Sequence, residues 1–147
     1  MITGLSHASI FVLDQERAKA FYTETLGFTL KTDAVMGEGF EGAGSGFRWL
    51  TVSPPNQPDL EIVLADPSMG HDEETATTIR DLVAKGAMGA GVWEADDVRK
   101  TYAELKERGV EFLQEPTERP YGVEALFRDD SGNWFSLTQP FHRAASQ

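Results

Sequence analysis

Cysteine is absent from the 147 residues. This absence excludes disulfide bonds, thiolate metal ligands and cysteine nucleophiles. The sequence also lacks an apolar run long enough to cross a bilayer, and it has no leader in which basic residues precede an apolar segment. We therefore expect a cytoplasmic protein that does not associate with membranes.

Positive charge is scarce, because 13 Lys and Arg residues face 24 Asp and Glu residues and leave a formal net charge of −11. A negative surplus of this size repels nucleic acid and anionic membranes, so neither is an expected partner. A neutral or cationic small molecule suits this charge better. The alternative explanation is that the charge simply keeps the protein in solution.

The stretch Leu5–Asp14 predicts a strand that runs directly into a helix. Its residues are rich in β-branched and aromatic types, and its last residue is an aspartate, a good helix N-cap. Because strand side chains alternate, Ile10 and Val12 share an aliphatic face, while His7 and Phe11 lie on the other. The strand is expected to pack its aliphatic face on a helix.

The same signals predict the remaining elements of the first half. A helix should end at Gly27, and strands are expected over Thr29–Thr32, Phe47–Ser53 and Asp59–Leu64. We interpret the glycine-rich stretch Gly37–Gly46 as a flap or a subunit-contact loop.

After a connector that carries a helix, the pattern starts again. A helix capped by Asp96 should follow the first strand of this half and end at Gly109. The expected strands are Met88–Ala95, Glu111–Glu115, Val123–Arg128 and Trp134–Thr138.

The two halves can be superimposed at a constant shift of 82 residues, which places Asp14 on Asp96 and Gly27 on Gly109. This repeat predicts an α+β fold made of two βαβββ modules. The modules are expected at 1–66 and 87–140, with a connector with a helix at 67–86 and a tail at 141–147. The same shift places His7 on Gly89.

A paired module of this order resembles the vicinal oxygen chelate (VOC) superfamily, which includes glyoxalase I, bleomycin-resistance proteins, fosfomycin-resistance enzymes and extradiol dioxygenases. The resemblance implies one VOC-type domain, in which both modules form a curved mixed sheet around a central cleft with the helices outside. It also implies a homodimer, because this fold often dimerises. The stretches that carry the resemblance are Leu5–Ile10, Ala20–Tyr22, Leu26–Phe28, Leu60–Leu64, Arg119–Gly122 and Asp130–Pro140.

The resemblance further implies a metal site with one ligand from the first strand and one from the last strand of each module. The first module offers His7 and Glu61, but the second offers Gly89, which has no side chain, and Ser136, a poor ligand. Two ligands are fewer than the three that catalytic zinc or non-haem iron usually has. A divalent metal such as zinc, manganese, nickel or iron therefore needs a further ligand.

The side chains that could complete this set are Tyr121, Glu118 and Glu124, which the family's architecture would bring near the cleft. The alternative is that no metal binds. In that case His7 and Glu61 form a hydrogen-bonded polar pair across the cleft.

Strand alternation, with His7 and Glu61 taken as cleft-facing, predicts that all three tryptophans lie on one face. Such rings describe a pocket for a flat or aromatic ligand. The alternative is that the rings fill the interior or an interface between protomers. The candidate ligand-binding residues are Phe11, Phe47, Trp49, Trp93, Tyr121, Trp134 and Ser136.

Three functions follow from this reading. The first is a small-molecule binder of the bleomycin-resistance type, which sequesters an aromatic or cationic compound in an aromatic cleft. The second is a metal-dependent lyase, isomerase or dioxygenase of the glyoxalase or extradiol type, with His7 and Glu61 as ligands and Glu61 as the candidate catalytic residue. The third is an interaction protein with a cleft filled by side chains.

Overall fold

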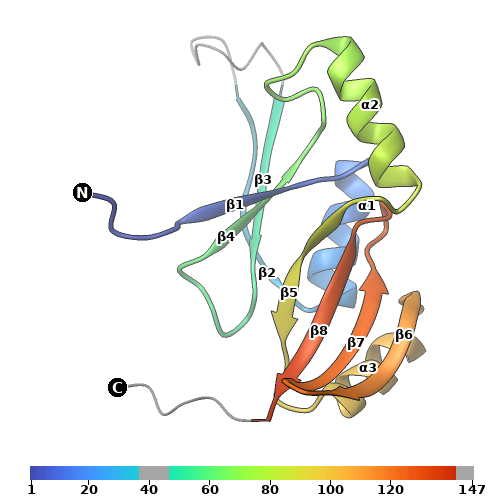
Figure 1. Ribbon diagram of the computed structural model, residues 1–147. Coiled ribbons are helices and arrows are strands. Elements are labelled where there is room, and N and C mark those ends of the chain that lie inside the picture. Colours follow the sequence, from blue (N-terminus) through green and yellow to red (C-terminus); the bar gives the residue numbers. More distant parts are fainter. Residues whose placement is uncertain (37–46, 142–147) are drawn as a thin grey trace. The chain divides into compact units, whose positions relative to one another are not determined.

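The computed structural model describes residues 1–36 and 47–141 (Figure 1). The chain divides into two compact units, Met1–Lys85 and Gly86–Gln147, and each is described by itself. The stretch interpreted as a flap or subunit-contact loop, Gly37–Gly46, lies outside the described residues, as do residues 142–147 of the expected tail. No helix in the described part of the chain combines the length and the apolar character needed to span a membrane.

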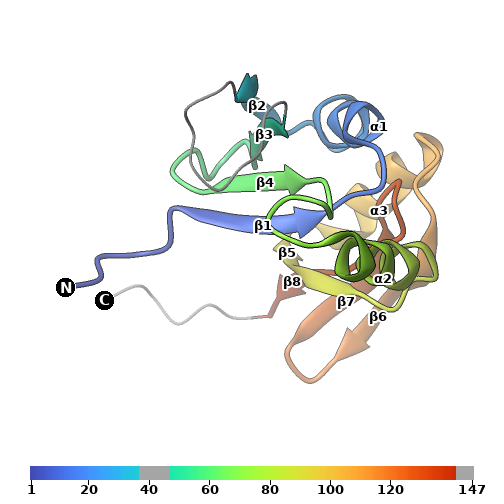
Figure 2. The same cartoon turned by 90° about the horizontal axis from the view of Figure 1, so that it is seen from above.

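The first unit is built on a four-stranded mixed sheet with the order β1-β4-β3-β2, and Figure 2 shows β4 between β1 and β3. Strands β1 and β4 run parallel, and the other two pairs are antiparallel. The strands are β1 (His7–Phe11), β2 (Thr29–Met36), β3 (Phe47–Ser53) and β4 (Glu61–Ala65).

Helix α1 (Gln15–Ala20) begins as the sequence predicts, because the Asp14 carboxylate accepts a hydrogen bond from the Arg17 amide at 3.0 Å. The helix continues as a π-helical segment, η1 (Phe21–Thr25), and the chain then turns at Gly27, whose φ is 78°. A longer helix, α2 (Glu73–Ala84), is capped in the same way by Asp72.

The aliphatic core of this unit lies on the sheet face of Leu50 and Val52, and the opposite face is partly buried as well, since Thr51 and Val63 are 0% and 1% exposed. Leu50 and Val52 of β3 are fully buried, and Tyr22 is the largest fully buried side chain that the first helical segment contributes. The other buried aliphatic residues on this face are Ile10, Val12, Ile62 and Leu64.

The second unit repeats the order, with a sheet arranged β5-β8-β7-β6 and β8 between β5 and β7 (Figure 1). The predicted α+β class and the two βαβββ modules are therefore confirmed. The elements are β5 (Gly89–Glu94), α3 (Val98–Glu107), β6 (Phe112–Arg119), β7 (Gly122–Arg128) and β8 (Trp134–Pro140).

Two predictions about this unit are wrong in detail. The N-cap of α3 is Asp97 and not Asp96, because the Asp97 carboxylate accepts from the Lys100 amide at 3.1 Å. Strand β6 runs through Pro116 to Arg119 instead of ending at Glu115. A proline is tolerated there because β6 is an edge strand and its register shifts between Gln114 and Thr117.

A chain of aromatic rings forms much of the core of the second unit. Phe127 stacks on Phe135 with ring centroids 5.4 Å apart, and Phe135 in turn contacts Trp93 at 5.5 Å. On the other side, Phe127 contacts Phe112, which meets Tyr102 of α3 edge-on at 4.6 Å. These rings therefore link β5, β8, β7, β6 and α3 in one layer.

Candidate functional site

The parallel pairing of β1 with β4 brings together the two metal-ligand candidates of the first unit. His7 lies directly opposite Glu61 in the ladder, and the His7 Nε2 atom is 3.3 Å from Glu61 Oε2. The other carboxylate oxygen, Oε1, accepts a hydrogen bond from the Thr51 hydroxyl at 2.7 Å. The Glu61 carboxylate is thus held between an imidazole and a hydroxyl.

Aromatic rings surround this polar pair on the same face of the sheet. The Trp49 indole lies 6.1 Å from the His7 ring, measured between centroids, and Phe47 meets Trp49 edge-on at 6.4 Å. Because Trp49, Thr51 and Phe47 are alternate residues of β3, they share one side of the strand. We call the five residues His7, Phe47, Trp49, Thr51 and Glu61 the aromatic-acid face.

The donor set of the aromatic-acid face is too small for a catalytic transition metal. His7 and Glu61 supply two protein ligands, whereas catalytic zinc and non-haem iron sites usually have three. Within residues 1–36 and 47–141, no group of three or more His, Asp or Glu side chains is placed to hold a metal ion. The geometry matches a polar pair of imidazole and carboxylate better than a complete metal site.

Phe11 lies further along β1 and makes a different contact. It shares the strand face of His7 by alternation, but its ring meets His71 edge-on with centroids 5.5 Å apart. The structure therefore places Phe11 beside the loop that precedes α2, and it groups Phe47 and Trp49 with His7.

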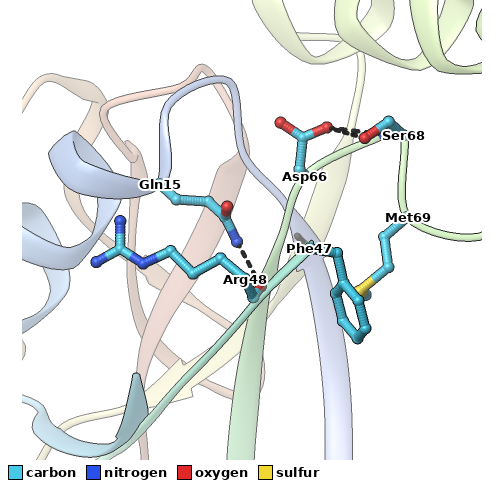
Figure 3. Close-up of a pocket in the computed structure, with 6 residues that line it drawn as sticks. All are labelled: Gln15, Phe47, Arg48, Asp66, Ser68 and Met69. Atoms are coloured by element: carbon cyan, nitrogen blue, oxygen red, sulfur yellow. Dashed lines mark hydrogen bonds between the residues drawn. The ribbon is translucent and has the colours of Figure 1, made fainter. Parts of the chain in front are cut away.

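A small pocket of about 230 Å³ opens in the first unit where α1 begins (Figure 3). The Gln15 side-chain amide closes part of its wall by donating to the backbone carbonyls of Arg48 and Leu64, at 3.0 and 2.9 Å. Phe47 is the candidate ligand-binding residue that it shares with the aromatic-acid face. The lining residues are Gln15, Phe47, Arg48, Asp66, Ser68 and Met69.

Asp66 carries the negative charge of this pocket. Burial by itself raises the pKa of its carboxyl group, but hydrogen bonds from Ser68 and the nearby Arg80 guanidinium outweigh burial and lower the pKa. Asp66 accepts a hydrogen bond from the Ser68 hydroxyl at 2.6 Å and another from the Arg80 guanidinium at 2.8 Å. The Asp66 carboxylate is thus already hydrogen-bonded to side chains of the protein itself.

In the second unit, the prediction that Trp93 shares a face with Trp134 is wrong. The ladder pairs Trp93 with Leu137 and Val92 with Ser136, so Trp93 points toward the core and Val92 is 67% exposed. The cause is a register shift between Gly89 and Gly91, which adds one residue to β5 and reverses the alternation after it.

The same shift changes which residues of this unit correspond to His7 and Glu61. Gly89 lies opposite Trp134, and a Cβ atom at position 89 would come within 2.6 Å of the indole. Ser136 lies opposite Val92. The second unit therefore has no imidazole-carboxylate pair at this ladder position, and a tryptophan covers the glycine.

In this unit another acidic residue, Glu124, accepts hydrogen bonds from two of the candidate ligand-binding residues. Glu124 accepts from the Tyr121 hydroxyl at 2.7 Å and from the Ser136 hydroxyl at 2.6 Å. The bond to Glu124 is the main reason why the pKa of the Tyr121 phenol is raised. The signal that locates Glu124 is alternation on β7, where Val123, Ala125 and Phe127 are buried.

Comparison with known proteins places this arrangement in a family. The sequence model of the Glyoxalase/Bleomycin resistance protein/Dioxygenase superfamily matches residues 4–137. The chain belongs to this superfamily. The predicted VOC resemblance is thereby confirmed, because the match spans both βαβββ modules and the strands that carry His7, Glu61 and Glu124.

Several relatives of this superfamily member cover nearly its whole length. The solved structure of UcmS2 is 51% identical, covers 95% of this chain and 99% of its own, and has a TM-score of 0.84. TnmS3, described as an antibiotic binding protein from Streptomyces sp. CB03234, is 35% identical over 95% and 97% of the two chains, with a TM-score of 0.70. YurT of Bacillus subtilis (strain 168) is 35% identical over 89% of this chain and 94% of its own.

Proposed function

We propose that this superfamily member binds an aromatic small molecule that carries a positive charge, and that the aromatic-acid face of the first unit is its site. The observation that carries the proposal is the Glu61 carboxylate beside the Trp49 and His7 rings on one sheet face. A planar ligand could stack on the indole while its cationic group approaches the carboxylate. The protein would then sequester the compound without chemical change.

The energetics of the face favour such a ligand. An offset-stacked or edge-to-face ring pair contributes about 0.5–1.5 kcal/mol beyond area burial, and a cation near an indole adds a similar amount. The side chains of His7 and Glu61 are 40% and 26% exposed, so a ligand can reach both. The net charge of −11 also attracts cations at long range.

The relatives support small-molecule binding as the general function. TnmS3 is described as an antibiotic binding protein, and it covers 95% of this chain at 35% identity. We therefore propose an aromatic antibiotic as the ligand class for this chain.

The experiment is a titration of the full chain with doxorubicin, a planar aromatic antibiotic with a protonated amine. Binding is followed by quenching of the fluorescence of doxorubicin itself, so that replacement of a tryptophan does not remove the signal. Trp49→Leu should weaken binding about two- to tenfold, which corresponds to the loss of one stacking pair. Glu61→Gln should weaken doxorubicin binding but not the binding of its neutral N-acetyl derivative.

Trp93→Phe is the matched control, because Trp93 lies in the core layer of the second unit and keeps an aromatic ring in this variant. It should leave the affinity within a factor of two. The proposal is refuted if doxorubicin and a wider panel of planar aromatic antibiotics fail to bind saturably. It is also refuted if Trp49→Leu and Trp93→Phe weaken binding equally.

The metal-dependent alternative stays a prediction that elemental analysis can test. Protein grown separately with zinc, manganese, nickel and iron would be dialysed and assayed for bound metal. One equivalent of metal that is lost in His7→Ala and in Glu61→Gln would favour an enzyme. Less than a tenth of an equivalent, unchanged by either variant, would exclude this reading.

A further inference from the structure

We propose that the second unit carries its own recognition site for a protonated amine, built from Glu124, Tyr121, Ser136 and Trp134. This site goes beyond the proposed function, because it lies in the other unit and uses different residues. We call these four residues the Glu124 site.

The register of the two sheets shows how the Glu124 site arises. In the first unit Thr51 pairs with Val63, and Glu61 stands two residues before Val63 on β4. In the second unit Glu124 pairs with Thr138, and Ser136 stands two residues before Thr138 on β8.

In each unit, a side chain of the third strand therefore reaches the residue of the last strand that lies two positions before its own ladder partner. Each diagonal pair joins a hydroxyl to a carboxylate, at 2.7 Å in the first unit and 2.6 Å in the second. In the first unit the carboxylate is on the last strand, and in the second unit it is on the third strand.

The ladder position of His7 and Glu61 is taken in the second unit by Gly89 and Trp134, because Glu61 N bonds to Ser6 O and Trp134 N bonds to Met88 O. Glu61 has His7 opposite it on the first strand, whereas the residue opposite Ser136 is the apolar and exposed Val92. The hydrogen bonds that hold Glu124 come instead from two neutral hydroxyls, those of Tyr121 and Ser136. Neither hydroxyl neutralises the negative charge.

The Glu124 carboxylate has room for a further donor. Each carboxylate oxygen can accept two hydrogen bonds, and Tyr121 and Ser136 bond to different oxygens. Arg119 is the nearby cation, but its Nε atom lies 3.8 Å from Glu124 and its terminal nitrogen donates to Gln114 at 2.9 Å. The Glu124 side chain is 16% exposed, so it is reachable yet partly desolvated, which strengthens its attraction for a cation.

Two exposed aromatic rings complete the site. Trp134 lies two residues before Ser136 on the same face of β8, and it covers Gly89, where a side chain would collide with the indole. Tyr121 is 53% exposed and Trp134 is 37% exposed. A carboxylate bonded to an exposed tyrosine, with a tryptophan further along the same sheet face, offers an ammonium group acceptors for its three N–H donors and accessible π faces.

The test uses 2-phenylethylammonium as the cationic probe and 2-phenylethanol as its neutral counterpart. Backbone amide chemical shifts of the full chain are followed by NMR during each titration, so that binding is assigned to residues. We expect the ammonium probe to shift the amides of 121–124 and 134–138, and the alcohol to bind at least fivefold more weakly there.

Two substitutions with the same change in charge separate the site from general electrostatics. Glu124→Gln should weaken the ammonium probe about tenfold at these amides. Glu118→Gln should leave its affinity within a factor of two, because Glu118 pairs with Val123, whose buried side chain lies on the other face of the sheet. Arg119→Gln should strengthen binding about threefold, because it removes the competing cation.

The Tyr121 phenol provides a second readout that does not depend on affinity. Its pKa is raised by the hydrogen bond to Glu124, so Glu124→Gln should lower it toward the ordinary tyrosine value in an ultraviolet titration.

Three results would overturn the proposal: equal binding of the two probes, equal effects of Glu124→Gln and Glu118→Gln, or a Tyr121 pKa that Glu124→Gln leaves unchanged. Trp49→Leu should not alter the shifts at 121–124. Failure of the doxorubicin experiment would therefore leave this test intact, and the converse also holds.

Discussion

Replacement of Asp33 by asparagine is expected to destabilise the first unit by about 2 kcal/mol at neutral pH. Asp33 accepts a two-point interaction from Arg48, with Nε to Oδ1 at 2.7 Å and Nη2 to Oδ2 at 2.8 Å, and a third hydrogen bond from Lys19 at 2.8 Å. These bonds join α1, β2 and β3. The amide of the introduced asparagine could keep one acceptor oxygen but would lose the charge.

The size of this effect follows from exposure and geometry. A hydrogen bond to a charged group contributes roughly 1.5–3 kcal/mol when protected, whereas a fully exposed ion pair contributes about 0–1 kcal/mol. The side chains of Asp33 and Arg48 are 22% and 20% exposed, so the cluster lies between these limits. The two-point geometry moves the value upward, and the remaining Arg48–Glu16 bond at 2.7 Å moves it downward.

The same cluster predicts how stability depends on pH. Hydrogen bonds from Arg48, and then from Lys19, hold the pKa of Asp33 far below its ordinary value of 3.8. Because the pKa is lower in the folded state, the stabilisation is present in full above the unfolded pKa and is lost as the pH falls through the folded one. The difference between the wild type and Asp33→Asn should therefore shrink below about pH 4.

The assay is urea unfolding of both proteins at pH 7, 5 and 3, with Asp59→Asn as the control. Asp59 is an exposed carboxylate before β4, and its replacement makes the same change in charge. We expect the control to alter the free energy of unfolding by less than about 0.5 kcal/mol at every pH. A wild-type to Asp33→Asn difference that stays constant from pH 7 to pH 3 would refute the assignment of the stabilisation to ionised Asp33.

Two further predictions concern the turns of the second unit. Asp129→Ala should lower the free energy of unfolding, measured in urea, by about 3 kcal/mol. The reason is that Asp129 Oδ1 accepts hydrogen bonds from three successive backbone amides of the hairpin turn, at 2.9–3.0 Å. A loss below about 1 kcal/mol would show that these bonds contribute little. Gly122→Ala should cost more than about 3 kcal/mol, since its Cβ would overlap the backbone carbonyl oxygen of Gln139, whereas Gly109→Ala meets open space and should cost about 1 kcal/mol. Equal shifts of melting temperature for the two glycine variants would contradict the packing at Gly122.

Some expectations from sequence stay predictions. A homodimer is expected from the resemblance, and a cytoplasmic location is expected from the composition. The mass of the protein in solution, measured by sedimentation, would decide the first. The ligand-binding roles of the candidate residues depend on the two titrations described above.

Much of the fold could be predicted because its signals are local. Asp14 caps α1 through an amide three residues away, and Gly27 supplies the backbone conformation at which the helical segment ends. Within a single strand, alternation separates buried Phe135 and Leu137 from Trp134 on the opposite face. A helix cap and a period of two are properties of a few consecutive residues, so no knowledge of the partners is needed.

The candidate sites depended on contacts between residues distant in the sequence. Alternation gave the wrong face for Trp93, because the bulge at Gly89–Gly91 is defined by pairing with β8. The hydrogen bond from Ser136 to Glu124 crosses two strands diagonally, and its existence depends on their register. By itself, the sequence determined which residues cap helices and which strand positions are apolar. The tertiary structure decided which polar groups meet, because only strand pairing sets the distances between them.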